Sequence, residues 1–206
     1  IQEKYRAGYF THYAGEGTIR SAKLTYKGEE VDLCLCPTHA HFSQEENTRI
    51  LTLDPVEIVF ADLTVKLQTR LLFEEGSANI RIERKILEMS KPDAKVELNE
   101  YIVACYGTTE YTEDMSAVTL SAVKGTNTVT LAYEYKCREE YMDGADCVSA
   151  VIPPIETKVS MSCDRADATG YMKEGYAFSP MFTLGYKTEI RDKEVFSTWL
   201  SLEKAN

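Results

Sequence analysis

The chain has 206 residues, of which 44% are hydrophobic and 27% are charged, which is the composition of an ordinary globular protein. Its 33 acidic and 23 basic side chains give a formal net charge of −10, which repels phosphate backbones and disfavours nucleic-acid partners. No apolar run approaches the length of a membrane span, so no membrane span is expected. The negative charge remains compatible with neutral or cationic partners.

The sequence leaves the cellular compartment open. It begins with Ile1 rather than Met, so we expect that a signal or pro-segment was removed or that the chain is a fragment of a longer one. It contains no N-x-[ST] glycosylation sequon, and its six cysteines allow disulfides without requiring them. A secreted or cell-surface location is one possibility among several.

The first predicted elements form a hairpin. The alternating run "TIRSAKLTY" (18–26) is followed by the turn "KGEE", and "VDLCLC" (31–36) returns as the second strand until Pro37 ends it. If 31–36 is a strand, Cys34 and Cys36 point to the same side and lie too far apart for a disulfide.

The motif "CLCPTHAHF" offers two alternatives. Cys34 and Cys36 could bind a soft cation such as zinc, with His39 or His41 completing the tetrahedron. The Cys-x-Cys spacing is tighter than usual, and the simpler interpretation is two core cysteines followed by a loop with two histidines. We therefore favour no metal and predict no cofactor.

His39 and His41 are also candidate catalytic bases. Histidine transfers protons near neutral pH, and the chain has 13 tyrosines that could act beside it. Histidines in exposed loops are more often bystanders, so this alternative is secondary.

The middle of the chain alternates most clearly. In "LTVKLQTRLLF" (63–73), leucine and valine face one side and charged or amide residues face the other, which predicts a half-buried strand. A turn at "EEGS" leads to "ANIRIERKILEM" (78–89), with Ile80 and Ile82 on one face and Ile86 displaced by a bulge. A helix over 81–92 is the disfavoured alternative.

Further alternating runs continue to the end of the chain. The run "SAVTLSAV" (116–123) is joined by "KGTN" to "TVTLAYEYKC" (128–137), and three more follow: 157–163, 176–190 and 195–203. Ten or more short strands separated by turns predict an all-β, antiparallel β-sandwich that forms a single domain over 1–206.

The block from Leu63 to Gly107 resembles the central part of galactose-mutarotase-like super-sandwich domains. The similarity lies in a long strand, an acidic–glycine hairpin, a second long strand and the turn phrase "LEMSKPDAKVELNEYIV". It implies this fold and contact with carbohydrate. The family carries a histidine at the end of the strand that follows, where this chain has Tyr101, so the resemblance implies carbohydrate contact more than mutarotase catalysis.

An acidic loop rich in tyrosine is the predicted ligand contact. In "CYGTTEYTEDMS" (105–116), aromatic faces can stack on sugar rings and carboxylates can accept hydroxyl hydrogen bonds. The alternative is a solvated acidic loop whose tyrosines pack on the sheet edge. The candidate ligand-binding residues are Tyr106, Glu110, Tyr111, Glu113 and Asp114.

A second acidic stretch, "CREEYMDGADC" (137–147), could offer oxygen ligands to calcium, although it does not fit the twelve-residue calcium loop. The alternative is an acidic hairpin loop closed, in an oxidising compartment, by a disulfide between Cys137 and Cys147. The four carboxylates concerned are Glu139, Glu140, Asp143 and Asp146.

We expect a carbohydrate-binding domain, or one associated with carbohydrate processing. The alternatives are a sugar epimerase or polysaccharide lyase that uses histidine and tyrosine, and a secreted or surface subunit that assembles through strand edges. Whether the protein is an enzyme stays open, although no nucleophile elbow, phosphate loop or dinucleotide fingerprint is present.

Overall fold

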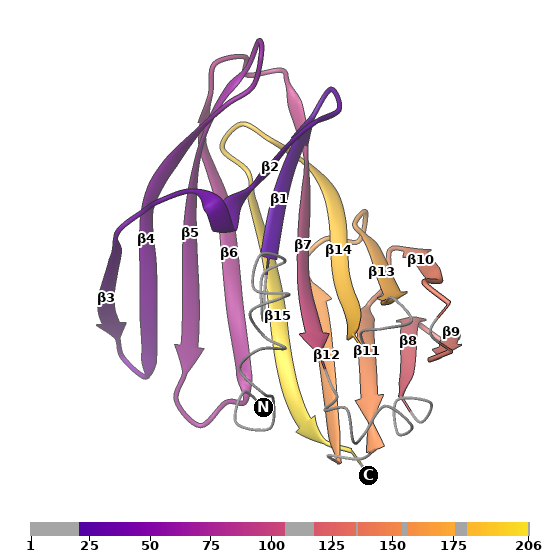
Figure 1. Ribbon diagram of the computed structural model, residues 1–206. Coiled ribbons are helices and arrows are strands. Elements are labelled where there is room, and N and C mark those ends of the chain that lie inside the picture. The colour runs from indigo at the N-terminus through magenta and orange to yellow at the C-terminus, as the bar shows by residue number, and fades with distance from the viewer. Residues whose placement is uncertain (1–20, 106–117, 135, 154–155, 176–180, 206) are drawn as a thin grey trace, which may run out of the picture.

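The computed structural model describes residues 21–105, 118–134, 136–153, 156–175 and 181–205. In these residues two antiparallel sheets pack face to face as a β-sandwich, which confirms the predicted fold class (Figure 1). The described part contains no α-helix. Its helical structure is a short 3₁₀ turn, and no helix in it is long and apolar enough to cross a membrane.

One sheet has six strands in the order β10-β13-β14-β7-β1-β2. Its strands are β1 (Ser21–Tyr26), β2 (Glu29–Asp32), β7 (Lys95–Cys105), β10 (Glu139–Asp143), β13 (Thr169–Glu174) and β14 (Met181–Arg191).

The other sheet has nine strands in the order β3-β4-β5-β6-β15-β12-β11-β8-β9. Its strands are β3 (Ala40–Glu45), β4 (Thr48–Val59), β5 (Thr64–Glu74), β6 (Asn79–Met89), β8 (Thr119–Lys124), β9 (Asn127–Ala132), β11 (Cys147–Ile152), β12 (Thr157–Cys163) and β15 (Val195–Lys204).

The core lies between the two sheets because each long strand presents alternate apolar residues to the other layer. β14 lies against β6, β11 and β12, and β13 lies against β8 and β11. On β5 and β6 the core-facing residues Val65, Leu67, Ile82 and Ile86 are at most 1% exposed. The period-two pattern that predicted these strands therefore also identified their buried face.

The first hairpin is confirmed, but its second strand is shorter than predicted. Lys27 and Gly28 both take positive φ values, of 49° and 85°, as a tight two-residue turn between β1 and β2 requires. β2 ends at Asp32, whose carboxylate accepts a hydrogen bond from the Cys34 amide at 2.8 Å and starts the 3₁₀ turn Leu33–Leu35. The predicted strand over 31–36 is therefore wrong beyond Asp32.

The strand assignment of β6 is confirmed, and the helical alternative over 81–92 is wrong. A bulge is present, but it lies after Ile86 and not before it as predicted: pairing is regular from Ile82 to Ile86, whereas Lys66 of β5 pairs with Glu88, so that Leu87 is the extra residue.

A buried ion pair links the two sheets across the core. Arg84 of β6 donates to the Glu100 carboxylate of β7 at 2.7 and 3.1 Å and to the Thr69 hydroxyl at 2.6 Å. Burial disfavours the charged guanidinium, but Glu100 outweighs burial and raises the pKa of Arg84. The pair thus stays ionised and fixes one sheet against the other.

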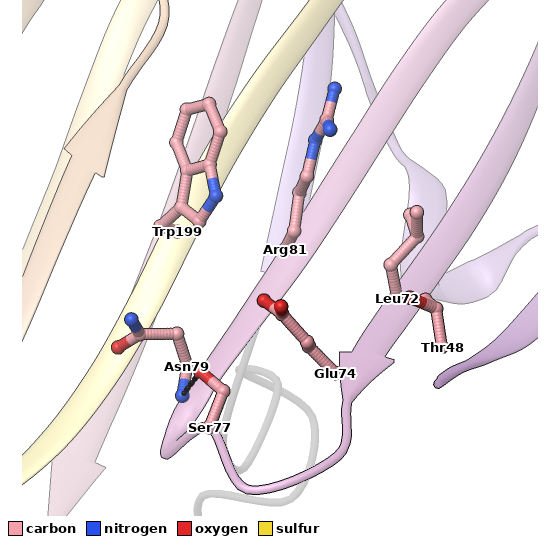
Figure 2. Close-up of a pocket in the computed structure, with 7 residues that line it drawn as sticks. All are labelled: Thr48, Leu72, Glu74, Ser77, Asn79, Arg81 and Trp199. Carbon is pink, nitrogen blue, oxygen red and sulfur yellow. Dashed lines mark hydrogen bonds between the residues drawn. The ribbon is translucent and has the colours of Figure 1, made fainter. Parts of the chain in front are cut away.

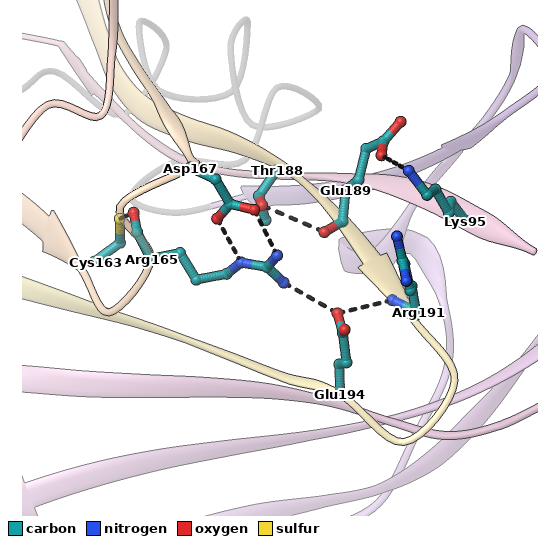
Figure 3. A network of polar contacts seen from close by, with 8 residues as sticks. All are labelled: Lys95, Cys163, Arg165, Asp167, Thr188, Glu189, Arg191 and Glu194. Atoms are coloured by element: carbon teal, nitrogen blue, oxygen red, sulfur yellow. Dashed lines mark hydrogen bonds and ion pairs between the residues drawn. The ribbon is translucent and has the colours of Figure 1, made fainter.

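A second polar network fixes the β14–β15 turn (Figure 3). Arg165, between β12 and β13, donates to both carboxylate oxygens of Asp167, at 2.9 and 2.8 Å, and to Glu194 at 3.0 Å. Glu194 also accepts from the Arg191 amide at 3.1 Å. The guanidinium of Arg165 thus joins Asp167 to Glu194 of the turn, and we assign the network a structural role.

Candidate functional site

Three tyrosines and one glycine form a row across four strands of the six-stranded sheet. Tyr101 of β7 pairs with Gly185 of β14, Gly185 pairs with Tyr171 of β13, and Tyr171 pairs with Tyr141 of β10. Paired residues of antiparallel strands share a face, and the chain neighbours of this row point into the core. This tyrosine row therefore lies on the outer face of the sheet.

Gly185 provides the space in which the Tyr171 ring lies. A Cβ atom at Gly185 would meet ring atoms of Tyr171 at 2.6 to 2.7 Å, which is closer than side chains approach. The Tyr171 hydroxyl donates to the Asn99 side-chain oxygen of β7 at 2.9 Å. The ring is thus fixed at both ends, and Tyr171, Tyr101 and Val103 form a small buried cluster apart from the main core.

Tyr141 is the exposed member of the row. Its ring lies 5.8 Å from that of Tyr171 with an interplanar angle of 29°, and the residue is 49% exposed. Its hydroxyl donates to Glu139 at 2.6 Å, and this bond, together with partial burial, raises the pKa of Tyr141 to about 12. Tyr141 is therefore a neutral, oriented aromatic surface across the physiological pH range.

Charged side chains border the two stacked rings. The ammonium of Lys187 lies 5.7 Å from the ring centroid of Tyr141 and 5.5 Å from that of Tyr171. Lys173 pairs with Glu139 on the other side. An exposed aromatic face with a cationic donor and a carboxylate acceptor beside it can bind a ring that carries hydroxyl groups.

The predicted ligand loop lies outside the described residues. Tyr106, Glu110, Tyr111, Glu113 and Asp114 all fall within 106–117, so the structure leaves them a prediction. β7, which carries Tyr101, ends at Cys105, directly before this segment.

The two candidate catalytic histidines lie at an edge of the nine-stranded sheet. His41 belongs to the edge strand β3 rather than to a loop, and its Nε2 is 2.9 Å from the Asp54 carboxylate of β4. His39 precedes β3, and its carbonyl accepts from the Asp54 amide at 2.8 Å. The structure therefore places both histidines on the other sheet from the tyrosine row.

The two cysteines of the same motif are not the pair of core residues that the sequence indicated. Cys34 is exposed and Cys36 is half-buried, since the chain turns at Asp32 instead of continuing along the sheet. Burial raises the pKa of the Cys36 thiol, which favours its protonated form. Among the described residues, no group of three or more His, Cys, Asp or Glu is placed to hold a metal ion.

Within the acidic stretch 137–147, Glu139–Asp143 form the edge strand β10. β10 pairs with β13, and its Asp143 accepts from the Thr169 hydroxyl at 2.6 Å. The predicted disulfide is wrong because Cys137 precedes β10 while Cys147 begins β11 of the other sheet, and both are free thiols.

No local pattern in the sequence indicated that these three tyrosines would form a row. The three tyrosines lie in three separate strands, far apart along the chain, and each resembles any other aromatic residue in a strand. Only the register of four strands brings them together around Gly185. A glycine inside the long strand β14 was the one local signal of a close approach.

No family model matches this chain, and no curated protein matches it. Solved structures do match. A putative aldose 1-epimerase from Escherichia coli is 9% identical with a TM-score of 0.55, over 88% of this chain and 79% of that one. A galactose mutarotase related enzyme from Lactobacillus acidophilus is 9% identical with a TM-score of 0.54, over 89% and 78%.

An alpha-N-acetylgalactosaminidase from Bifidobacterium bifidum is 10% identical with a TM-score of 0.63, and the match covers 90% of this chain but 31% of that one. At these identities the comparisons establish the fold. The fold is similar to that of the mutarotase-related proteins, as the resemblance of the block 63–107 implied.

Proposed function

We propose that this protein binds carbohydrate on the outer face of its six-stranded sheet, with the tyrosine row as the central contact. The observation that carries the proposal is the exposed ring of Tyr141, stacked on the anchored ring of Tyr171 between Lys187 and Glu139. Proteins of similar fold include, by name, a putative aldose 1-epimerase and an alpha-N-acetylgalactosaminidase, which supports a sugar ligand.

The row offers the interactions that a pyranose ring uses. The flat ring of Tyr141 can stack on the C–H face of the sugar, and its orientation is already fixed by Glu139, so little entropy is lost on binding. Sugar hydroxyl groups can donate to Glu139 and accept from Lys187, and such charge-assisted hydrogen bonds are the stronger ones.

Binding is proposed in place of turnover because the candidate bases His39 and His41 lie on the other sheet. The predicted loop stays part of the proposal, since it follows β7 directly and its residue types suit sugar contact. It contributes Tyr106, Glu110, Tyr111, Glu113 and Asp114.

The proposal is tested by titration calorimetry with a panel of neutral mono- and oligosaccharides. Tyr141→Ala should weaken binding roughly tenfold, because a stacking contact contributes on the order of 1 kcal/mol or somewhat more. Its melting temperature should stay nearly unchanged, since the ring is half exposed. Phe42→Ala is the matched control, because Phe42 is 78% exposed on the distant edge strand β3.

Two results would contradict the proposal. One is that no sugar of the panel binds the wild-type protein. The other is that Tyr141→Ala binds as tightly as the wild type.

A further inference from the structure

A groove runs across the outer face of the nine-stranded sheet, on the opposite side of the molecule from the tyrosine row. Its centre is the half-buried Trp199 of β15, which pairs with Arg81 of β6 (Figure 2). A hollow of about 210 Å³ opens between them and the β5–β6 turn. It is lined by Thr48, Leu72, Glu74, Ser77, Asn79, Arg81 and Trp199.

A second hollow, of about 420 Å³, continues the groove on the other side of Trp199 and shares Asn79 with the first. Serines form its floor: Ser162 of β12 pairs with Trp199, and Ser160 pairs with Ser201. Because these side chains are small, the indole ring borders both hollows. The first hollow has a mostly polar lining, whereas the second combines polar groups with Cys147 and Met161.

Arg81 has hydrogen-bonding capacity left over. Its guanidinium lies 5.4 Å from the Trp199 ring centroid, and its Nη2 donates to Glu83 at 2.8 Å. Its Nε is buried and has no hydrogen-bond partner among the described residues.

We propose that this groove is a second carbohydrate site, which binds a neutral oligosaccharide of two or more units lying across β6, β15 and β12. An aromatic ring flanked by amide, hydroxyl and guanidinium groups matches a ring with several hydroxyl groups. The first hollow, of about 210 Å³, is below the roughly 300 Å³ of a typical ligand pocket, whereas the second, of about 420 Å³, is within the range, and so are the two together. A chain of sugars can occupy both.

The charges in the groove select a neutral ligand. The guanidinium of Arg81 is already paired with Glu83, while Glu74 lines the first hollow and Glu203, which is 4.0 Å from the Lys158 ammonium, lines the second. An acidic sugar would therefore meet a carboxylate in each hollow and no unpaired guanidinium. The inference stands independently of the tyrosine row, because the two sites lie on opposite sheets.

Trp199 is the only tryptophan of the protein, so its fluorescence reports on this groove alone. The experiment measures acrylamide quenching of Trp199 while neutral glucose and galactose trisaccharides, in α- and β-linked forms, are titrated in. We expect at least one trisaccharide to protect Trp199 from quenching in a saturable way, with a midpoint of about 1 mM or below. The corresponding monosaccharide should protect far more weakly.

Variants assign any effect to the groove. Ser162→Leu fills the second hollow beside Trp199 and should raise the midpoint tenfold or more, and Arg81→Met, which keeps the stem of the side chain but removes its donors, should raise it as well. Tyr141→Ala serves as the control and should leave the midpoint unchanged.

The inference is overturned if no trisaccharide protects Trp199 from quenching at a concentration about ten times the expected midpoint of about 1 mM. It is equally overturned if Ser162→Leu and Arg81→Met both keep the wild-type midpoint. Protection that Tyr141→Ala removes would also overturn it, by moving the binding to the other sheet. Calorimetric binding that depends on Tyr141 but leaves Trp199 unprotected would support the tyrosine row alone.

Discussion

At Gly185 the absence of a side chain lets the Tyr171 ring lie against the sheet. We predict that Gly185→Ala displaces this ring, because the new Cβ would lie 2.6 to 2.7 Å from its atoms. Overpacking of this kind costs about 1–3 kcal/mol, so the melting temperature should fall by several degrees and sugar affinity should fall with it. Calorimetry of both quantities checks the prediction.

Thr183→Ala is the matched control, since Thr183 lies two residues away on the same strand and face. It should change neither quantity appreciably. If Gly185→Ala keeps both the melting temperature and the affinity of the wild type, the Tyr171 ring does not depend on this glycine.

The buried pair of Arg84 and Glu100 gives a second prediction at the residue scale. Glu100→Leu leaves the guanidinium of Arg84 without its carboxylate, and breaking a buried pair typically costs about 3–5 kcal/mol of unfolding free energy. The double variant Arg84→Met with Glu100→Leu should recover most of this loss, because it leaves no unpaired charge. Denaturant titrations measure both; a double variant as unstable as the single one would argue against the explanation.

Of the buried pair, only Arg84 could be recognised from the sequence as a charged residue in the core. Arg84 interrupts the apolar face of Ile80, Ile82 and Ile86, so a charged residue at a core position was visible from the alternation alone. Its partner was not visible, because Glu100 belongs to the next strand along the chain, which joins the other sheet.

At the scale of elements, the alternation of apolar and polar residues predicted strands well wherever one face of the strand is apolar and the other is polar. β5 and β6 were predictable for this reason, but the position of the bulge was not, because it lies after Ile86 and not before it. β10 was not, since edge strands tolerate polar residues on both faces and an acidic edge strand has the composition of a loop. The end of β2 was missed because it depends on one local hydrogen bond from Asp32, which competes with the sheet.

Three turns at one end of the sandwich are joined through Asp62, which yields a pH prediction. Asp62, between β4 and β5, accepts hydrogen bonds from Lys27 at 2.8 Å and from Lys91 at 2.6 Å. These two bonds lower the pKa of Asp62 to about 2. A carboxyl whose pKa is lowered on folding stabilises the folded state above its unfolded pKa of about 3.9, and this contribution is lost as the pH falls towards 2.

We therefore expect Asp62→Asn to be less stable than the wild type at pH 6 and to approach it at pH 2. Denaturant midpoints of the two proteins at a series of pH values measure this difference. Glu88→Gln is the control, because Glu88 is exposed on the nearby strand β6 and should leave the pH dependence unchanged. A difference that grows as the pH falls would contradict the assignment.

At the scale of the whole molecule, the arrangement of the strands could not be read from the sequence. β7 pairs with β14, and β6 pairs with β15, across long separations along the chain. Local patterns carry no information about such partners, although the resemblance of residues 63–107 to a known family indicated the architecture. Both proposed binding surfaces are built from such distant pairings. Neither surface could be identified from the types of its residues alone.

The central claim is that carbohydrate binds the outer face of the six-stranded sheet at the tyrosine row. Amide chemical-shift mapping by NMR, during titration with the tightest-binding sugar of the panel, tests it most directly. The account predicts that the largest shifts occur around Tyr101, Tyr141, Tyr171 and Gly185, on β7, β10, β13 and β14. Saturable shifts that leave these four strands unchanged would contradict it.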